Sequence, residues 1–317
     1  MYGFLKKYLQ YTFWITISIL TGILLMSLSI KTTRYAHGLL KNRQSIVQKI
    51  KNVPANYATA NALSVWEIKE INPQTQKNTS LLFVGDIMLS RGVQKSVMKN
   101  FGGDFSLLFK KIKPFIQKRD IIFGNLEGPV SLLGKEIGNL YSFRMTPKAL
   151  KAIRGAGFSA LSIANNHIGD WGVRAFEDTI FRLKNSDIIP VGGGYDLNDA
   201  VNPKIIFKNG LKFGFLGFSD VGPDWLEASS DKAGILIANK SFTDIIKKAS
   251  QKTDVLIVSM HFGEEYHKHP SKRQKMLAKE AIDSGAKIVI GHHPHTQQKI
   301  EIYKKGIIAY SLGNFIF

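Results

Sequence analysis

Apolar and polar positions divide the chain into two parts at about residue 80. From Leu81 onward, short apolar runs typical of strands alternate with stretches whose apolar residues recur at helical spacing. Five such stretches are expected to be helices: FSLLFKKIKPFIQKR, TPKALKAIRGAG, RAFEDTIFRLKNS, SFTDIIKKASQK and KRQKMLAKEAIDSGA. This alternation is typical of a layered α/β domain. In VNPKIIFKNGLKFGFLGFSD, two strand-like runs flank Asn209 and Gly210, a strong hairpin signal, so we expect a mixed sheet.

The first 79 residues follow a different pattern. After a short basic segment, residues 1–11, the uncharged run at residues 12–30 is close to the ~20 residues that a membrane-spanning helix needs. A cleaved signal peptide is the alternative, but its apolar part is usually only ~7–15 residues and no small-x-small cleavage site follows, so we predict an uncleaved signal anchor. Residues 31–79 are polar, and we predict that they form a juxtamembrane stalk. Residues 80–317 are predicted to form a globular domain. Basic residues after the anchor, taken alone, place that domain in the cytoplasm.

Composition narrows the partners and the metal chemistry. With 43 Lys plus Arg against 24 Asp plus Glu, the formal charge is 43 − 24 = +19 and the pI is near 9.8. Such a field attracts polyanions, although the lysines are spread along the chain, and general basicity without a partner is the alternative. Cysteine is absent, which excludes a disulfide framework and a thiolate metal site. Oxygen and imidazole groups must therefore hold any metal.

Polar residues that bind metals or move protons follow five of the apolar runs. In an open α/β sheet, ligands collect beyond the carboxyl ends of the strands, so we expect these residues to converge into one metal-dependent active site. The runs and their residues are LLFVG with Asp86, IIFGN with Glu127, ALSIA with Asn166 and His167, VLIVSM with His261, and KIVIG with His292, His293 and His295.

The individual residues differ in how strongly they indicate a functional site. A helix N-cap is the alternative for Asp86, and an exposed loop acid is the alternative for Glu127. An amide oxygen such as that of Asn166 is a competent ligand of a hard cation, and a neighbouring His167 held by a carboxylate can act as a general acid or base. Three histidines in four residues, with a turn at Pro294, favour a metal site over packing. No nucleophilic serine elbow, phosphate-binding loop or dinucleotide fingerprint is present in the sequence.

These motifs together resemble a known family. The order GD-x-x-x-x-R, GN-L-E, NNH-x-x-D-x-G, H-x-G-x-E-Y, GHHPH and YSLGNF, from about Leu81 to Phe317, is similar to that of the CapA family of poly-γ-glutamate capsule-synthesis proteins, whose domain is similar to calcineurin-like metallophosphoesterases. The resemblance implies an α/β fold, a layered αββα sandwich with mixed sheets, preceded by one transmembrane helix. It also implies a single-pass protein of the cell membrane with its main domain outside the cell, and this outweighs the charge bias after the anchor.

The resemblance also implies the roles of the site residues. Two divalent metal ions (Mn, Zn or Fe) are expected, with the ligands Asp86, Glu127, Asn166, His261, His293 and His295. His167 corresponds to the acid that protonates the leaving group, and Asp170 and Arg91 are predicted to act with it. Substrate contacts are predicted for Arg91, Asn125, Arg144, Glu264, Tyr266 and His292.

The chain departs from the metallophosphoesterase pattern at two positions. Met88 stands where those enzymes usually carry a His ligand, and Glu127 stands where they carry an Asp. The first metal site is therefore short of one imidazole.

The leading hypothesis is a membrane-anchored protein of poly-γ-glutamate or similar anionic-polymer synthesis or export, with a di-metal hydrolase-type site. Its expected partners are the polymer, the membrane and other membrane subunits of a capsule-synthesis complex, and no specific nucleic acid is expected. The alternatives are a non-catalytic polyanion-binding subunit and a metal-dependent phosphodiesterase.

Overall fold

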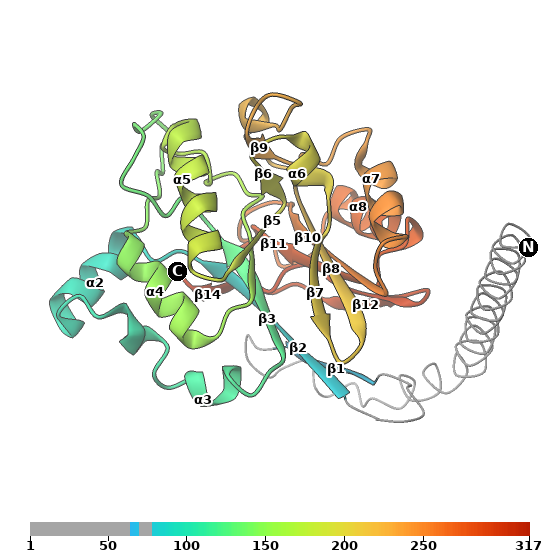
Figure 1. Cartoon of the computed structure of the whole chain (residues 1–317), viewed down its shortest axis with the longest axis horizontal. Helices are drawn as coiled ribbons and strands as arrows, with labels where there is room; N and C mark the ends of the chain where they lie inside the picture. The colour runs from blue at the N-terminus through green and yellow to red at the C-terminus, as the bar shows by residue number, and fades with distance from the viewer. Residues whose placement is uncertain (1–63, 70–77) are drawn as a thin grey trace, which may run out of the picture. The chain divides into compact units, whose positions relative to one another are not determined.

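Two six-stranded mixed sheets lie at the centre of the protein, and helices cover their outer faces (Figure 1). The structure, a computed structural model, describes residues 64–69 and 78–317. The predicted N-terminal segment and signal anchor, residues 1–30, lie outside the described residues. Within the described ranges, no helix combines the length and the apolar character needed to cross a membrane.

The first sheet has the order β1-β2-β3-β4-β5, and β14 also pairs with β2. Strands β2 to β5 and β14 run parallel, whereas β1 is antiparallel to β2. The pairing of β1 brings residues from the predicted stalk into this sheet. The strand bounds are β1 (Ser64–Lys69), β2 (Asn78–Ile87), β3 (Ile121–Leu126), β4 (Ala160–Ser162), β5 (Ile189–Val191) and β14 (Asn314–Ile316).

The second sheet has the order β12-β13-β11-β10-β8-β7. Its four inner strands are parallel and its two edge strands are antiparallel, which confirms the predicted mixed sheet. The predicted hairpin is formed by β7 and β8, with Asn209 and Gly210 both at positive φ, as its tight turn requires. The strand bounds are β7 (Lys204–Lys208), β8 (Leu211–Ser219), β10 (Val255–His261), β11 (Ile288–His292), β12 (Ile300–Tyr303) and β13 (Gly306–Ala309), and a separate short pair joins β6 (Gly193–Gly194) to β9 (Gly234–Ile235).

Four of the five predicted helices are present, and one prediction was wrong. Residues 105–119 do not form one helix, because Pro114 has no N–H to donate and its ring clashes with a preceding turn. They form instead a 3₁₀ turn, η2, and a single helical turn, α3, in which Pro114 lies in the first turn. The helices are α2 (Arg91–Phe101), η2 (Phe105–Leu108), α3 (Lys113–Ile116), α4 (Pro147–Ala156), α5 (Gly172–Asn185), α6 (Leu197–Val201), η3 (Asp224–Leu226), α7 (Phe242–Ser250) and α8 (Lys272–Asp283).

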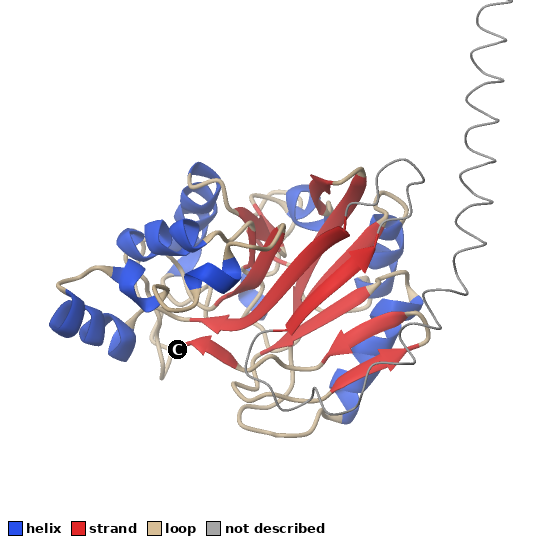
Figure 2. Cartoon of the chain, turned by 90° about the horizontal axis from the view of Figure 1, so that it is seen from below, coloured by secondary structure: helices blue, strands red, loops and turns tan. Residues whose placement is uncertain are grey.

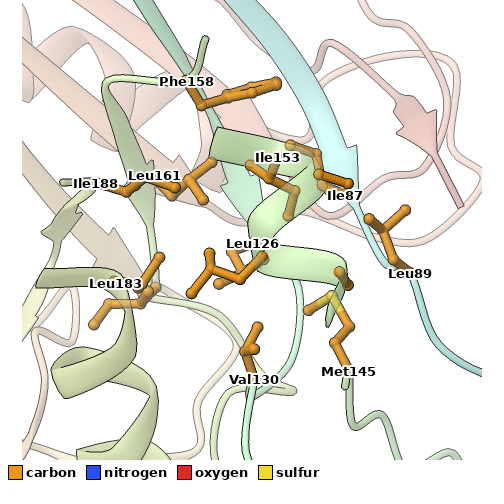
Figure 3. Close-up of a cluster of buried hydrophobic side chains, with 14 of the residues drawn as sticks. Ile87, Leu89, Leu126, Val130, Met145, Ile153, Phe158, Leu161, Leu183 and Ile188 are labelled. Atoms are coloured by element: carbon orange, nitrogen blue, oxygen red, sulfur yellow. The ribbon is translucent and has the colours of Figure 1, made fainter. Parts of the chain in front are cut away.

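Three hydrophobic clusters hold the layers together. Between the sheets, the rings of Phe123 and Phe215 stack with centroids 5.4 Å apart. The outer face of the first sheet packs against α2, α4 and α5 through a cluster that includes Leu161, Ile153 and Leu183 (Figure 3). The outer face of the second sheet packs against α7 and α8. Figure 2 shows the resulting order of helices, two sheets and helices.

A C-terminal crossing joins the two sheets at the point where both approach the predicted site. Between β13 and β14 the chain passes from the second sheet to the first, and it bonds to both: Leu312 N donates to Gly291 O (3.2 Å), and Asp86 N donates to Gly313 O (2.9 Å). A Cβ on Gly85 would lie 1.8 Å from Gly313 O, and one on Gly291 would lie 2.0 Å from Tyr310 O. Only glycine therefore permits this contact, one residue before Asp86 in one strand and one before His292 in the other.

We expect the substitution Gly85→Ala to destabilise the domain by about 3 kcal/mol or more, because the new methyl group and the Gly313 carbonyl cannot both keep their positions. Urea unfolding followed by circular dichroism measures this loss. Gly155→Ala is the matched control: a Cβ there meets no neighbouring atom within 4 Å, and alanine favours helix by up to about 1 kcal/mol. Equal stabilities for the two variants contradict the role assigned to the crossing.

Candidate metal centre

The predicted site residues lie together at the carboxyl ends of parallel strands from both sheets. Asp86 is the penultimate residue of β2, Glu127 directly follows β3, and Asn166 and His167 follow β4. From the second sheet, His261 ends β10, and the loop with His293 and His295 follows β11. The convergence expected from the sequence is thus confirmed, although the ligand and catalytic roles stay predictions.

Two groups of side chains have the geometry to hold a cation. In the first, one donor atom each from Asp86, Glu127 and His261 lies within 4.8 Å of the others, and all three residues are buried. In the second, Glu265, His293 and His295 satisfy the same distance. His295 links the groups, since its Nδ1 lies 3.3 Å from Asp86 Oδ2 and its Nε2 lies 3.6 Å from Glu127 Oε1.

Two asparagines organise the first group. Asn125 Nδ2 donates to Asp86 Oδ1 (2.9 Å) and to Glu127 Oε2 (3.3 Å). Asn165 Nδ2 donates in turn to Asn125 Oδ1 (3.1 Å) and to the Leu126 carbonyl (2.9 Å). Asn125 was predicted to contact substrate, but its amide is buried and holds the two carboxylates in place. Asn165 was not predicted, because nothing in the pair Asn165 and Asn166 indicates which amide faces the cluster.

Burial and neighbouring charges set the protonation of the first group. Burial raises the pKa of Asp86, but the imidazoles of His292 and His295 outweigh it, and the net shift is downward. Burial, reinforced by the charge of Asp86, holds the pKa of Glu127 well above its usual range. Burial also lowers the pKa of His261 well below that of a free imidazole. The group thus contains one stable carboxylate, a second that resists ionisation beside it, and a neutral imidazole suited to metal binding.

The second group shows opposite shifts at its two imidazoles. Burial lowers the pKa of His293. Burial also lowers that of His295, but the bond to Asp86 outweighs it and the net shift is upward. His295 Nδ1 also lies 2.8 Å from Asn314 Oδ1, so β14 helps to orient this ring.

Several buried polar side-chain atoms of the site have no hydrogen-bond partner among the described residues. They are Glu127 Oε1, both ring nitrogens of His292, and His293 Nδ1. Each such atom costs about 1–3 kcal/mol when it is left unsatisfied, so a cluster of four is unusual. A bound cation would accept lone pairs from oxygen and imidazole nitrogen atoms of this kind. Its positive charge would also stabilise the ionised form of Glu127, which burial disfavours. The residues present therefore fit a divalent metal.

His167 lies beside the cation-binding groups with its orientation fixed. Its Nδ1 is 2.8 Å from Asp170 Oδ2, and its ring packs at 3.9 Å from the ring of Phe143. Asp170 is fully buried and also accepts from Asn139 Nδ2 and from the Phe143 backbone N–H. Next to it, Asn166 Oδ1 lies 2.8 Å from His261 Nε2, which joins β4 to β10 across the site.

The remaining predicted substrate contacts differ in position. The Arg91 guanidinium lies over the rings of Tyr141 and Phe143, and the Phe143 ring in turn packs against His167. Arg144 stacks on Trp171 at 3.4 Å. His292 is fully buried, 3.3 Å from Asp86 Oδ1, and therefore belongs to the inner cluster instead of the substrate surface.

The two neighbouring glutamates of the HFGEEY segment separate. Glu264, predicted to contact substrate, is exposed and pairs with His267, whereas Glu265 reaches the imidazoles of the second group. Both glutamates are exposed, and the sequence alone does not indicate which of them reaches the imidazoles. Tyr266, the next residue, donates its N–H to the Pro294 carbonyl (2.7 Å) and thereby ties this loop to the GHHPH loop.

Backbone strain is concentrated at the site. Seven non-glycine residues have positive φ among those described, and four of them are Arg91 (48°), Tyr266 (61°), His293 (96°) and His295 (55°). Such conformations are costly for residues with a Cβ and persist where the surrounding structure enforces them, which is typical of functional sites.

Met88 is the position at which the family resemblance leads us to expect a histidine ligand. Its side chain is buried, and its sulfur accepts a hydrogen bond from the Ser90 hydroxyl (2.9 Å). The first group accordingly contains two carboxylates and only one imidazole.

Comparison with known proteins agrees with the motifs. Residues 80–317 match the sequence profile of the bacterial capsule synthesis protein PGA_cap. The chain is 35% identical over 262 residues to the capsule biosynthesis protein CapA of Bacillus anthracis, covering 79% of this chain and 62% of the relative. It is 35% identical over 256 residues to the PGA biosynthesis protein CapA of Bacillus subtilis, covering 79% and 66%. The chain thus spans less than two thirds of the length of these relatives.

Among solved structures, the Haemophilus influenzae NAD nucleotidase is similar with a TM-score of 0.43 at 12% identity, covering 78% of this chain and 43% of that one. The family assignment depends instead on the sequence profile, which covers the whole globular domain and every motif of the site. The chain belongs to the bacterial capsule synthesis protein PGA_cap family.

Proposed function

We propose that this protein is a membrane-anchored, extracytoplasmic component of the synthesis or export of poly-γ-glutamate or a similar anionic polymer, and that its domain is a metal-dependent hydrolase acting on that polymer or its precursor. The observation that carries the proposal is the buried cluster of Asp86, Glu127 and His261 beside an oriented His167. The family, the names of its relatives and the charge of +19 support an anionic polymer as substrate. Other membrane subunits of a capsule-synthesis complex are proposed as partners.

In this proposal, one set of side chains binds the metal ions. Asp86, Glu127, Asn166, His261, His293 and His295, with the addition of Glu265, would hold two divalent cations (Mn, Zn or Fe). Bound cations of this type supply Lewis acidity and activate water for attack on a phosphoryl or acyl centre.

His167 would deliver a proton to the leaving group. Asp170 accepts from Nδ1, so Nε2 is the nitrogen that remains to carry the transferred proton, and the contact with Phe143 keeps the ring in position. Arg91 and Arg144, stacked on aromatic rings nearby, would bind anionic groups of the substrate.

Replacing Glu127 by Gln is expected to weaken metal binding by at least about 10-fold, because it removes a buried carboxylate from the centre of the cluster. Elemental analysis of the purified full chain after reconstitution with Mn²⁺, Zn²⁺ or Fe²⁺ measures occupancy. Glu264→Gln removes the same charge from an exposed position and should leave occupancy unchanged. Wild-type occupancy below about one metal per chain after reconstitution removes the enzymatic proposal.

His167→Ala is expected to reduce turnover by about 10²–10⁴-fold while metal occupancy stays at the wild-type level, because the imidazole moves a proton without holding the cation. Release assays over γ-glutamyl and phosphoester substrates, with each metal, measure turnover and identify the substrate bond. His269→Ala, an exposed histidine outside the cluster, is the control. Release from phosphoesters alone supports a phosphodiesterase instead.

A non-catalytic subunit that binds and guides the polymer is the second candidate, and the observation that favours it is Met88. For such a subunit, His167→Ala leaves polymer production in cells unchanged, whereas the hydrolase loses it. Met88→His gives a complementary test: we expect the added imidazole to raise affinity for the first metal by about 10-fold or more, measured by competition with a chelator. No change in affinity indicates that position 88 does not face a cation.

A further inference from the structure

Helix α2 and the segment that follows it expose large apolar side chains that the fold does not use. Within residues 91–119, four such side chains are exposed, and Phe115 is 65% exposed. The same segment packs against the domain, since Phe105, Phe109 and Ile116 are buried in the hydrophobic cluster on the outer face of the first sheet. The exposed set is Met98, Phe101, Leu107 and Phe115, and we refer to it, with the cations of the same segment, as the α2–α3 surface.

This surface is also the most basic part of the described chain for its length. Residues 91–119 contain eight Lys or Arg and one acidic residue, Asp104, which gives 8 − 1 = +7 of the total +19. Among the residues that the structure describes, none of these eight cations forms an ion pair with a carboxylate. Asp104 caps η2 by accepting from the Ser106 N–H, so it does not neutralise a lysine. The cations are Arg91, Lys95, Lys99, Lys110, Lys111, Lys113, Lys118 and Arg119, and all of them except the partly buried Arg119 are exposed.

We infer that the α2–α3 surface docks on an anionic lipid bilayer. Exposed Phe, Leu and Met among unpaired lysines is the composition of segments that lie in the membrane interface, where apolar side chains enter the acyl boundary and lysines reach the headgroups. A soluble polyanion complements the lysines but offers nothing to Phe115 or Met98. The apolar side chains therefore favour a bilayer over the polymer.

Docking in this way orients the metal centre. Arg91, the first residue of α2, lies over Tyr141 and Phe143, and Phe143 packs on His167, so the surface adjoins the proton-donor side of the site. Tyr141 and its neighbour Leu140 are themselves exposed and extend the apolar character beyond Arg91. In Figure 1, α2 and α3 lie on the side of the domain away from α7 and α8, which leaves the second sheet directed away from the bilayer. The inference uses the membrane location proposed above but not the hydrolytic activity.

The absence of cysteine allows a direct test on the full chain. Phe115→Cys, labelled with an environment-sensitive fluorophore and reconstituted in vesicles of phosphatidylcholine and phosphatidylglycerol, should show blue-shifted emission that a spin-labelled lipid quenches. Phe207→Cys is the matched control: Phe207 is 69% exposed on edge strand β7 of the second sheet, and its label should stay in water and unquenched. Equal quenching at the two positions, or none at Phe115→Cys, overturns the inference.

Charge variants separate lipid from polymer. Replacing Lys110, Lys111 and Lys113 by Gln should lower the ratio of docked to undocked protein by on the order of 100-fold, because each surface cation contributes about a factor of five with anionic lipid. Vesicles of phosphatidylcholine alone should give little docking. If the label at position 115 responds to added poly-γ-glutamate but not to lipid, the surface is a polymer site and the inference fails.

Failure of the anchor and failure of docking give different results. If residues 12–30 do not anchor the chain, alkaline carbonate extracts it from vesicles, and the same label then reports binding of the extracted chain to added vesicles. Metal occupancy and turnover of the charge variants should remain at wild-type levels, because no member of that triple lies in the metal centre.

Discussion

The site depends on two buried carboxylates that share one small volume. Asp86 and Glu127 are both fully buried, and the same asparagine amide donates to each. Burial raises the pKa of Glu127 and the charge of Asp86 raises it further, whereas the imidazoles of His292 and His295 outweigh burial at Asp86 and lower its pKa. The surrounding imidazoles offset this only in part, because burial keeps His261 and His293 neutral. Internal contacts of His292 and His295 with Asp86 therefore leave Glu127 Oε1 and several imidazole nitrogens without a hydrogen-bond partner, as expected for a site that also binds a cation.

Holding these groups in one place requires both sheets to stay in register at one end. The C-terminal crossing provides this constraint, because a single stretch of backbone bonds to the glycine before His292 and to Asp86 itself. The glycines allow a backbone approach that any side chain would prevent. The positive φ values of His293 and His295 accompany the same closeness: the His295 ring and the His293 backbone N–H both turn toward Asp86, which belongs to the other sheet.

The sequence predicts the strand ends well because periodicity and turn residues are local signals. The hairpin at Asn209 and Gly210 and four amphipathic helices are of this kind. What local patterns miss depends on tertiary contacts with strands distant in sequence. Such contacts determine that Asn165 donates to Asn125 whereas Asn166 lies against His261. They also determine that Glu265, and not Glu264, reaches the imidazoles of the second group. The helix expected at residues 105–119 was wrong for a local reason. The apolar spacing there is helical, but Pro114 cannot donate a backbone hydrogen bond, so it stands in the first turn of a short helix instead of inside a long one.

Met88 is the position at which the sequence departs from the predicted set of metal ligands, and its side chain is buried. Its sulfur accepts hydrogen bonds from the Ser90 hydroxyl (2.9 Å) and from the Ser90 backbone N–H (3.4 Å). The two candidate groups are unequal donor sets: the first group has two carboxylates and one imidazole, and the second has two imidazoles and one carboxylate. Oxygen-rich and imidazole-rich sets differ in the cations they favour, so the two positions need not hold the same metal or hold it equally tightly.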